Sequence, residues 1–242
     1  MLSSEQNPQK HWLIASENCP QQLSEQWFNA DYWRTKKAIM GESRGRSTTY
    51  FIDSQSVAGK APFVLRHYCR GGLYGKINYD RFLYLGIERT RPYRELELLE
   101  KMVAMELPVP HPVAGHVWQR GGFYQADILI EQIPASKDAY HHLCIGELEQ
   151  DVWHAIGTTI AAFHRQQVFH SDLNIHNILL DEQAKVWLID FDKCALRAGD
   201  QWKAENLARL HRSLTKEKTK QPNFHFTEQD WQVLLSGYQQ GG

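Results

Sequence analysis

The order of apolar and polar positions predicts β-strands in the first half of the chain. Four runs rich in β-branched and aromatic residues flank turns that contain glycine, at residues 54–60 and at Arg120-Gly121-Gly122. These runs are residues 48–52, 62–68, 115–119 and 123–133. We therefore expect two β-hairpins. The polar residues 1–35, which contain three tryptophans, one phenylalanine and one tyrosine, predict a helical extension that packs onto the strands.

Helical spacing of apolar residues dominates the rest of the chain. Pro92 opens a predicted helix over residues 93–106, which ends at Pro108-Val109-Pro110. Its apolar face is formed by Leu96, Leu99, Met102 and Val103. Further helices are predicted over residues 151–166, 200–214 and 227–238, and the last begins with the capping-type sequence Thr227-Glu228-Gln229-Asp230. Strands followed by helices predict an α+β protein.

Composition narrows the class of protein. A chain of 242 residues with 42% hydrophobic content can bury a sizeable core. A net charge of −1 gives no global attraction to nucleic acid, so we expect no nucleic-acid partner. The four cysteines are scattered, which predicts reduced thiols and a cytosolic protein. The sequence contains neither a membrane-spanning run nor a signal peptide, so the protein is expected to be soluble or to lie on a membrane surface.

Three residues near the C-terminal third have the spacing of a phosphotransfer site. Asn177 follows Asp172 by five positions, and Asp190 follows Asn177 by thirteen. The apolar runs 178–180 and 186–189 predict a short hairpin that places Asn177 and Asp190 side by side. The first carboxylate would orient the proton of an acceptor hydroxyl, and the other two groups are hard ligands for Mg²⁺. The alternative is a solvated Asp beside an ordinary hairpin, but three such groups rarely coincide at this spacing.

The motifs resemble those of the lipopolysaccharide kinase branch of the protein-kinase-like superfamily. The resemblance extends from about residue 36 to residue 214. The His-x-Asp-x4-Asn set is typical of the superfamily, and the stretch Leu-Arg-His-Tyr-x-Arg-Gly-Gly is typical of the members that act on 3-deoxy-D-manno-octulosonic acid (Kdo). The segments that carry the resemblance are residues 41–52, 64–72, 94–95, 107–110, 170–177, 190–194 and 206–214.

The resemblance implies a bilobal kinase-like fold that uses ATP and Mg²⁺. Residues 1–133 would form the N-lobe with its antiparallel sheet, and residues 134–242 the mainly helical C-lobe. Asp172 would be the catalytic base, and Asn177 and Asp190 would be the Mg²⁺ ligands.

The resemblance also implies nucleotide-binding residues in the N-lobe. Two glycines would belong to a loop over the phosphates, and Arg66 stands where such kinases usually have a phosphate-binding Lys. Glu95 would be the ion-pair partner of Arg66, and Lys76 is an alternative cation for the phosphates. Glu131 would lie at the hinge that presents backbone groups to the adenine. The implied set is Gly41, Gly45, Arg66, Lys76, Glu95 and Glu131.

Departures from protein kinases indicate a kinase of a small molecule or a glycolipid. Ser171, Asn174 and Asp192 replace residues typical of protein kinases, and only fifty residues follow Asp192. The implied acceptor is the 4-hydroxyl of Kdo on a lipid A precursor, at the cytoplasmic face of the bacterial inner membrane. The alternatives are a kinase of another small molecule, such as an aminoglycoside or a choline-like compound, and an inactive scaffold. The sequence indicates no protein partner.

Three groups of residues have two interpretations each. The cluster of Arg66, His67, Arg70 and Lys76 either meets an anionic ligand or forms a solvated strand face. The basic residues from Lys203 to Lys220 either hold the protein peripherally on an anionic membrane or form the solvated face of a core-packed helix. The twelve histidines are expected in loops or in the core rather than at a metal, and His170 is expected to brace the loop around Asp172.

Overall fold

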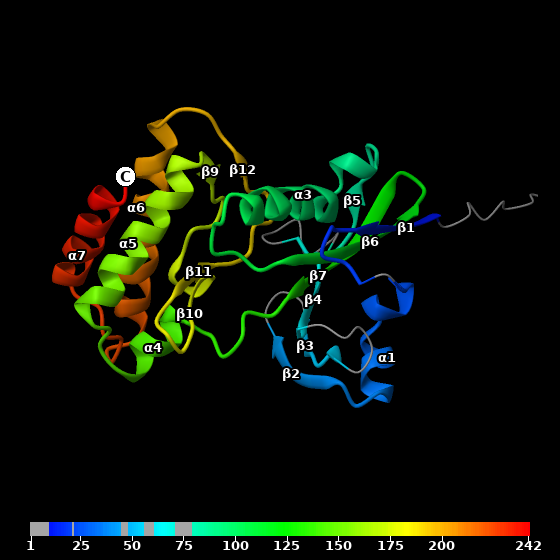
Figure 1. Ribbon diagram of the computed structural model, residues 1–242, viewed down its shortest axis with the longest axis horizontal. Helices are drawn as coiled ribbons and strands as arrows, with labels where there is room; N and C mark the ends of the chain where they lie inside the picture. Colours follow the sequence, from blue (N-terminus) through cyan, green and yellow to red (C-terminus); the bar gives the residue numbers. More distant parts are fainter. Residues whose placement is uncertain (1–9, 21, 45–47, 56–60, 71–78) are drawn as a thin grey trace, which may run out of the picture. The chain divides into compact units, whose positions relative to one another are not determined.

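The computed structural model describes residues 10–20, 22–44, 48–55, 61–70 and 79–242 (Figure 1). Backbone contacts divide the chain into two compact units. The first unit comprises residues 1–100 and 111–132, and the second comprises residues 101–110 and 133–242. The protein is a mixed α/β protein with an antiparallel sheet, as the sequence predicts, and this is compatible with a kinase-like fold. The bilobal arrangement with a boundary at residue 133 stays a prediction.

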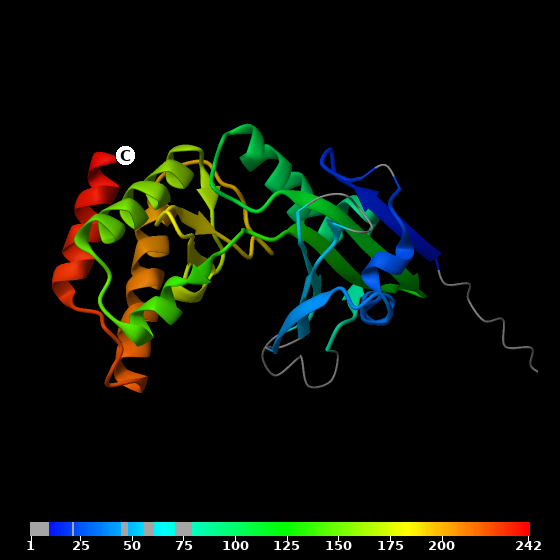
Figure 2. The same ribbon diagram turned by 60° about the horizontal axis from the view of Figure 1, so that its bottom comes forward.

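An antiparallel sheet forms the centre of the first unit (Figure 2). Its strand order is β1-β6-β7-β4-β3-β2, and β5 pairs with the start of β7. Both predicted hairpins are confirmed, as β3–β4 and as β6–β7 with Gly121 at φ 61° in the turn. The strands are β1 (Lys10–Ala15), β2 (Ile39–Arg44), β3 (Thr48–Ile52), β4 (Phe63–His67), β5 (Phe82–Leu83), β6 (Pro112–Arg120) and β7 (Phe123–Glu131).

The prediction of a helical N-terminal extension is wrong for the first described segment. Strand β1 pairs along its whole length with β6, about a hundred residues later in the chain. Its alternation explains the strand, because Trp12 and Ile14 point into the core while the residues between them face the other side of the sheet. Among the described residues up to Thr35, helical structure is limited to the 3-10 helix η1 (Glu25–Phe28) and to α1 (Ala30–Thr35).

Each face of this sheet is covered by a different element. On one face, Trp27, Phe28 and Trp33 from η1 and α1 pack against β3, β4, β6 and β7. On the other face lies α3 (Arg91–Ala104), preceded by the 3-10 helix η3 (Ile87–Arg89). Leu96 of α3 packs there with Val117 and Ile128. Because side chains alternate along a strand, neighbouring residues of β4 belong to different faces. Arg66 therefore lies on the same face as α3, where it binds Glu95, and His67 lies on the opposite face.

The second unit is mainly helical. The predicted helices are confirmed with small shifts in their ends, and α6 continues to Lys220 instead of ending near residue 214. Thr227 and Asp230 form the predicted capping box of α7. The helices are α4 (Ala139–Ile145), α5 (Gln150–Arg165), α6 (Gln201–Lys220) and α7 (Glu228–Gln240). The short strands are β8 (Lys137–Asp138), β9 (Val168–Phe169), β10 (Ile178–Leu180), β11 (Val186–Leu188) and β12 (Ala195–Leu196), and η4 (Ile175–Asn177) is a 3-10 turn.

Helices α5 and α7 approach each other through two glycines. A Cβ atom on Gly157 would lie 2.0 Å from the Leu234 carbonyl oxygen, and one on Gly237 would lie 2.1 Å from the His154 carbonyl oxygen. Any side chain at these positions would therefore push the helices apart. In the described part of the chain, no helix combines the length and the apolar character needed to cross a bilayer.

Candidate active site

A buried histidine holds the loop that carries Asp172 in the second unit. The ring nitrogen Nε2 of His170 lies 3.0 Å from the Ile189 carbonyl oxygen, and Nδ1 accepts the backbone N–H of Asp172 at 3.2 Å. Burial lowers the pKa of His170, so the ring is neutral and offers one donor and one acceptor. Both hydrogen bonds require the neutral ring, because Nε2 donates to a carbonyl oxygen while Nδ1 accepts an N–H. The expectation that His170 braces this loop is confirmed.

The predicted hairpin brings Asn177 opposite Ile189, the residue before Asp190. Strands β10 and β11 pair antiparallel, and the Ile189 N–H donates to the Asn177 carbonyl oxygen at 3.1 Å just beyond their last pair. The side-chain nitrogen of Asn177 donates to the Asp172 carbonyl oxygen at 2.9 Å. Because the amide nitrogen is used in this way, the amide oxygen of Asn177 is the atom that can coordinate a cation.

Asp190 occupies a left-handed backbone conformation with φ 64°. Asp and Asn tolerate this region better than other residues with a Cβ atom. The turn after it is closed by a hydrogen bond from Cys194 N–H to the Phe191 carbonyl oxygen, and Ser171 Oγ donates to the Asp192 carbonyl oxygen at 2.9 Å. Phe191 is buried and stacks on Phe163 of α5. The segment after Asp190 is therefore tied to the loop that carries Asp172.

Helix α6 contributes two residues to this site that the sequence analysis did not assign. Asn206 is buried and forms two hydrogen bonds with the backbone of His170, one to its N–H and one to its carbonyl oxygen. Arg209 binds Asp172, with Nε at 3.1 Å and Nη2 at 2.5 Å from the same carboxylate oxygen, Oδ1. The spacing of three places both side chains on one face of the helix. Both residues lie in the segment 206–214, which is part of the family resemblance. That resemblance is the signal in the sequence that could have identified them.

The first unit contains the predicted ion pair between β4 and α3. Nη2 of Arg66 lies 2.6 and 2.8 Å from the two carboxylate oxygens of Glu95. The Glu95 side chain is only 3% exposed, and the buried Tyr68 hydroxyl also donates to it at 2.6 Å. Burial and the negative charge of Glu95 raise the pKa of Tyr68 well above its ordinary value, so this hydroxyl stays a donor. Glu95 thus holds the Arg66 guanidinium in place.

The other predicted nucleotide-binding residues have different outcomes. Gly41 is not in a loop as predicted: it lies within β2, opposite Phe51, because the pairing with β3 continues through residues 41–44 after a register shift between Ile39 and Gly41. Gly45 and Lys76 lie outside the described residues. The Glu131 N–H donates to the His111 carbonyl oxygen, and its side chain accepts the Asn18 amide at 2.7 Å. A hinge role for Glu131 would therefore depend on its carbonyl group.

Comparisons with known proteins identify the family of the chain. The model of the family described as "Lipopolysaccharide kinase (Kdo/WaaP) family" matches residues 30–238. Proteins named 3-deoxy-D-manno-octulosonic acid kinase align over most of the chain. The protein from Photobacterium profundum is 44% identical over 212 residues, which is 88% of each chain. The protein from Mannheimia succiniciproducens is 44% identical over 227 residues, covering 92% of this chain and 93% of the relative.

Proposed function

Because the chain belongs to the lipopolysaccharide kinase (Kdo/WaaP) family and is a phosphotransferase acting on a hydroxyl group, we propose that it phosphorylates Kdo in lipopolysaccharide core assembly. The proposed reaction transfers the γ-phosphate of ATP to the 4-hydroxyl of Kdo on a lipid A precursor. The observation that carries the proposal is the joint placement of Asp172, Asn177 and Asp190 by one buried loop and one hairpin. In this proposal, residues 1–133 and 134–242 are the N- and C-lobes of the kinase-like fold.

The catalytic residue in the proposal is Asp172. Its carboxylate is 47% exposed, and Arg209 binds only one of its oxygens, Oδ1. The second oxygen, Oδ2, would accept the hydrogen of the acceptor hydroxyl and direct that oxygen at the γ-phosphate. Arg209 would act as a positioning residue, because its guanidinium limits rotation of the carboxylate.

The donor set of Asn177 and Asp190 fits Mg²⁺. An amide oxygen and a carboxylate are hard ligands, and Mg²⁺ sites commonly use one or two protein groups together with phosphate oxygens. When bound, Mg²⁺ neutralises charge on the nucleotide phosphates. His170 and Asn206 would keep the two ligands in register with Asp172, because both fix the backbone of the loop between β9 and β10.

The proposal is tested with radiolabelled ATP and a panel of acceptors. The panel contains a lipid A precursor with Kdo, the same precursor without Kdo, an aminoglycoside and choline. We expect label to enter only the Kdo-bearing lipid, and mild acid release of Kdo followed by NMR to place the phosphate on the 4-hydroxyl. Transfer to a soluble acceptor, or to the precursor without Kdo, would instead support the small-molecule alternative.

Arg66 is proposed to bind the ATP phosphates in place of the usual Lys. We expect Arg66→Ala to raise the apparent KM for ATP and to lower kcat, with kcat/KM falling roughly 10- to 100-fold for a lost charged contact. Arg66→Lys is expected to restore part of the loss. Steady-state kinetics with varied ATP measures both effects.

The Arg66 experiment needs a control for folding, because Arg66→Ala removes a cation from beside the buried Glu95 carboxylate. The double variant Arg66→Ala/Glu95→Gln also removes the charge of Glu95 and should keep the kinetic defect. Arg120→Ala, at the exposed end of β6, is the matched substitution and should behave as the wild type. Wild-type KM for ATP in the double variant would transfer the role to Lys76.

We also propose that the protein associates peripherally with the anionic cytoplasmic face of the inner membrane. The apolar side chains of α6 pack inside the protein, since Trp202, Leu210 and Leu214 are buried, so an electrostatic contact is the relevant mode. Four of its basic side chains have partners within the protein, which leaves a smaller patch than the sequence suggested. Those pairs are Lys203–Asp200, Arg209–Asp172, Lys220–Glu217 and Lys218 with the Phe224 carbonyl.

Replacement of Lys216, Lys218 and Lys220 by Gln should weaken liposome binding. A near-surface basic residue contributes about 1 kcal/mol, and two of these three have partners within the protein, so the partition coefficient should fall by at most about two orders of magnitude. Cosedimentation with anionic liposomes at low and high salt measures it, and salt should weaken wild-type binding. The control changes the exposed Lys10, Lys36 and Lys37 to Gln, which alters the net charge equally. Equal binding of both variants would move the membrane contact away from α6.

A further inference from the structure

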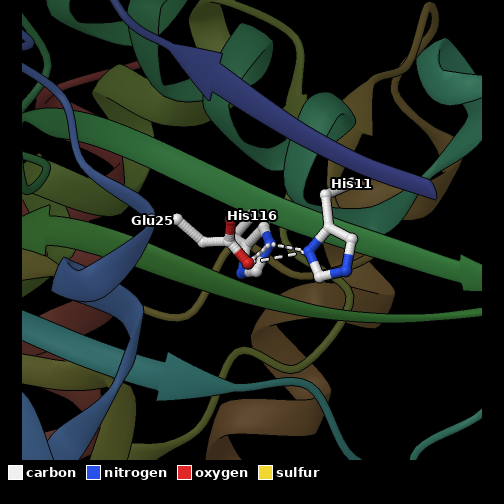
Figure 3. A group of neighbouring side chains, drawn as sticks. All are labelled: His11, Glu25 and His116. Atoms are coloured by element: carbon white, nitrogen blue, oxygen red, sulfur yellow. Dashed lines mark hydrogen bonds and ion pairs between the residues drawn. The ribbon is translucent and has the colours of Figure 1, made fainter. Parts of the chain in front are cut away.

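Two histidines and a glutamate converge on the face of the first unit's sheet that η1 covers (Figure 3). His11 comes from β1, Glu25 from η1 and His116 from β6. Nδ1 of His11 lies 2.8 Å from Glu25 Oε1 and 3.1 Å from His116 Nε2, and the last two atoms are 3.6 Å apart. Three separate elements thus each direct one potential metal-ligand atom at a common point.

The three distances lie on either side of the edge length of a metal coordination tetrahedron. With metal–nitrogen and metal–oxygen bonds of about 2.0–2.1 Å, tetrahedral geometry puts neighbouring ligand atoms roughly 3.3 Å apart. Hydrogen bonding satisfies the group less well, because Nδ1 of His11 carries at most one hydrogen and approaches both the Glu25 carboxylate oxygen and the His116 ring nitrogen. A cation at the centre would engage the lone pairs of all three atoms at once.

The surroundings favour a cation over an anion. A cavity of about 640 Å³ adjoins the three residues, and its described lining contains Asp127 but no Lys or Arg. Asp127 is the cross-strand neighbour of His116, and His67 holds its carboxylate at 2.7 Å. The cavity also gives space for a water molecule as the fourth ligand.

We propose that His11, Glu25 and His116 bind a divalent transition-metal ion of the Zn²⁺ type, which fastens β1 and η1 onto β6. The two imidazoles select against Mg²⁺, which prefers six oxygen ligands, so this site is chemically distinct from Asn177 and Asp190. Its occupancy does not depend on the proposed acceptor. The ion stabilises the folded unit, because a preformed arrangement of these three residues is absent from the unfolded chain.

The test uses the full-length protein, freed of metal with a chelator and then titrated with Zn²⁺ in the presence of millimolar Mg²⁺. Calorimetry should give one strong site per chain, which mass spectrometry of the dialysed protein would confirm. At a free Zn²⁺ concentration about 100 times Kd, the melting temperature should rise by roughly 5 to 10 °C.

Glu25→Gln and His11→Gln test the assignment, because both side chains are partly exposed and their replacement spares the core. Each should weaken Zn²⁺ binding at least tenfold and remove the thermal shift. Glu228→Gln is the matched control: it alters another His–Glu pair, His211–Glu228 at 3.1 Å, on α6 and α7. It should bind Zn²⁺ as the wild type does. Absence of Zn²⁺ binding to the wild type, or unchanged affinity in both test variants, would overturn the proposal and leave a proton-sharing cluster.

Discussion

Asp172→Asn is expected to lower the rate of phosphoryl transfer by about 10²- to 10⁴-fold, the usual contribution of a positioned general base. The substitution preserves the size of the side chain and its ability to accept from Arg209, so the loop should keep its conformation. It removes the capacity to take up the hydroxyl proton. The loss should therefore appear in kcat, while the KM for ATP and the melting temperature stay near wild-type values.

The matched control is Asp151→Asn, an exposed carboxylate in the first turn of α5, which should leave kcat unchanged. Single-turnover measurements with saturating lipid acceptor separate the chemical step from product release. Wild-type turnover in purified Asp172→Asn protein would remove Asp172 from its assigned role. A second variant, Arg209→Lys, should lower kcat less than Arg209→Ala, because an ammonium restores the charge without the two-pronged contact.

Local patterns predicted the elements whose partners are near in sequence. The β6–β7 hairpin and the β10–β11 hairpin both join strands across a short turn, so alternation and turn residues were enough. Strand β1 was missed because its partner β6 lies about a hundred residues later, and its short apolar run, residues 12–15, stands in an otherwise polar segment. Gly41 was assigned to a phosphate-covering loop through the family resemblance, yet here it pairs within a strand.

The same distinction applies to the candidate sites. Asp172, Asn177 and Asp190 lie on one loop and one hairpin, so their spacing in the sequence was enough to predict that they lie close together. The cluster of His11, Glu25 and His116 is different, because β1, η1 and β6 are brought together only by the packing of the sheet. The number of histidines in the sequence could not show which of them lie together in the fold. Arg209 likewise reaches Asp172 only through the tertiary packing of α6.

Asp190→Ala should weaken binding of Mg·ATP by at least roughly 10- to 100-fold, because even outer-shell changes at metal sites cost that much affinity. The carboxylate is the charged member of the proposed ligand pair, and Asn177 alone offers a single neutral oxygen. Titration calorimetry with ATP at several Mg²⁺ concentrations measures the loss. The dependence of binding on Mg²⁺ should also become shallower.

Asp190→Asn distinguishes loss of the ligand charge from loss of the backbone conformation. Residue 190 has φ 64°, and Ala pays about 1–2 kcal/mol there while Asn tolerates it. Both variants should therefore lose Mg·ATP affinity, whereas only Asp190→Ala should also show a lower melting temperature. Unchanged Mg·ATP affinity in Asp190→Asn, together with weak binding in Asp190→Ala, would mean that the turn after β11 matters only for its shape. Asp190 would then not be a metal ligand.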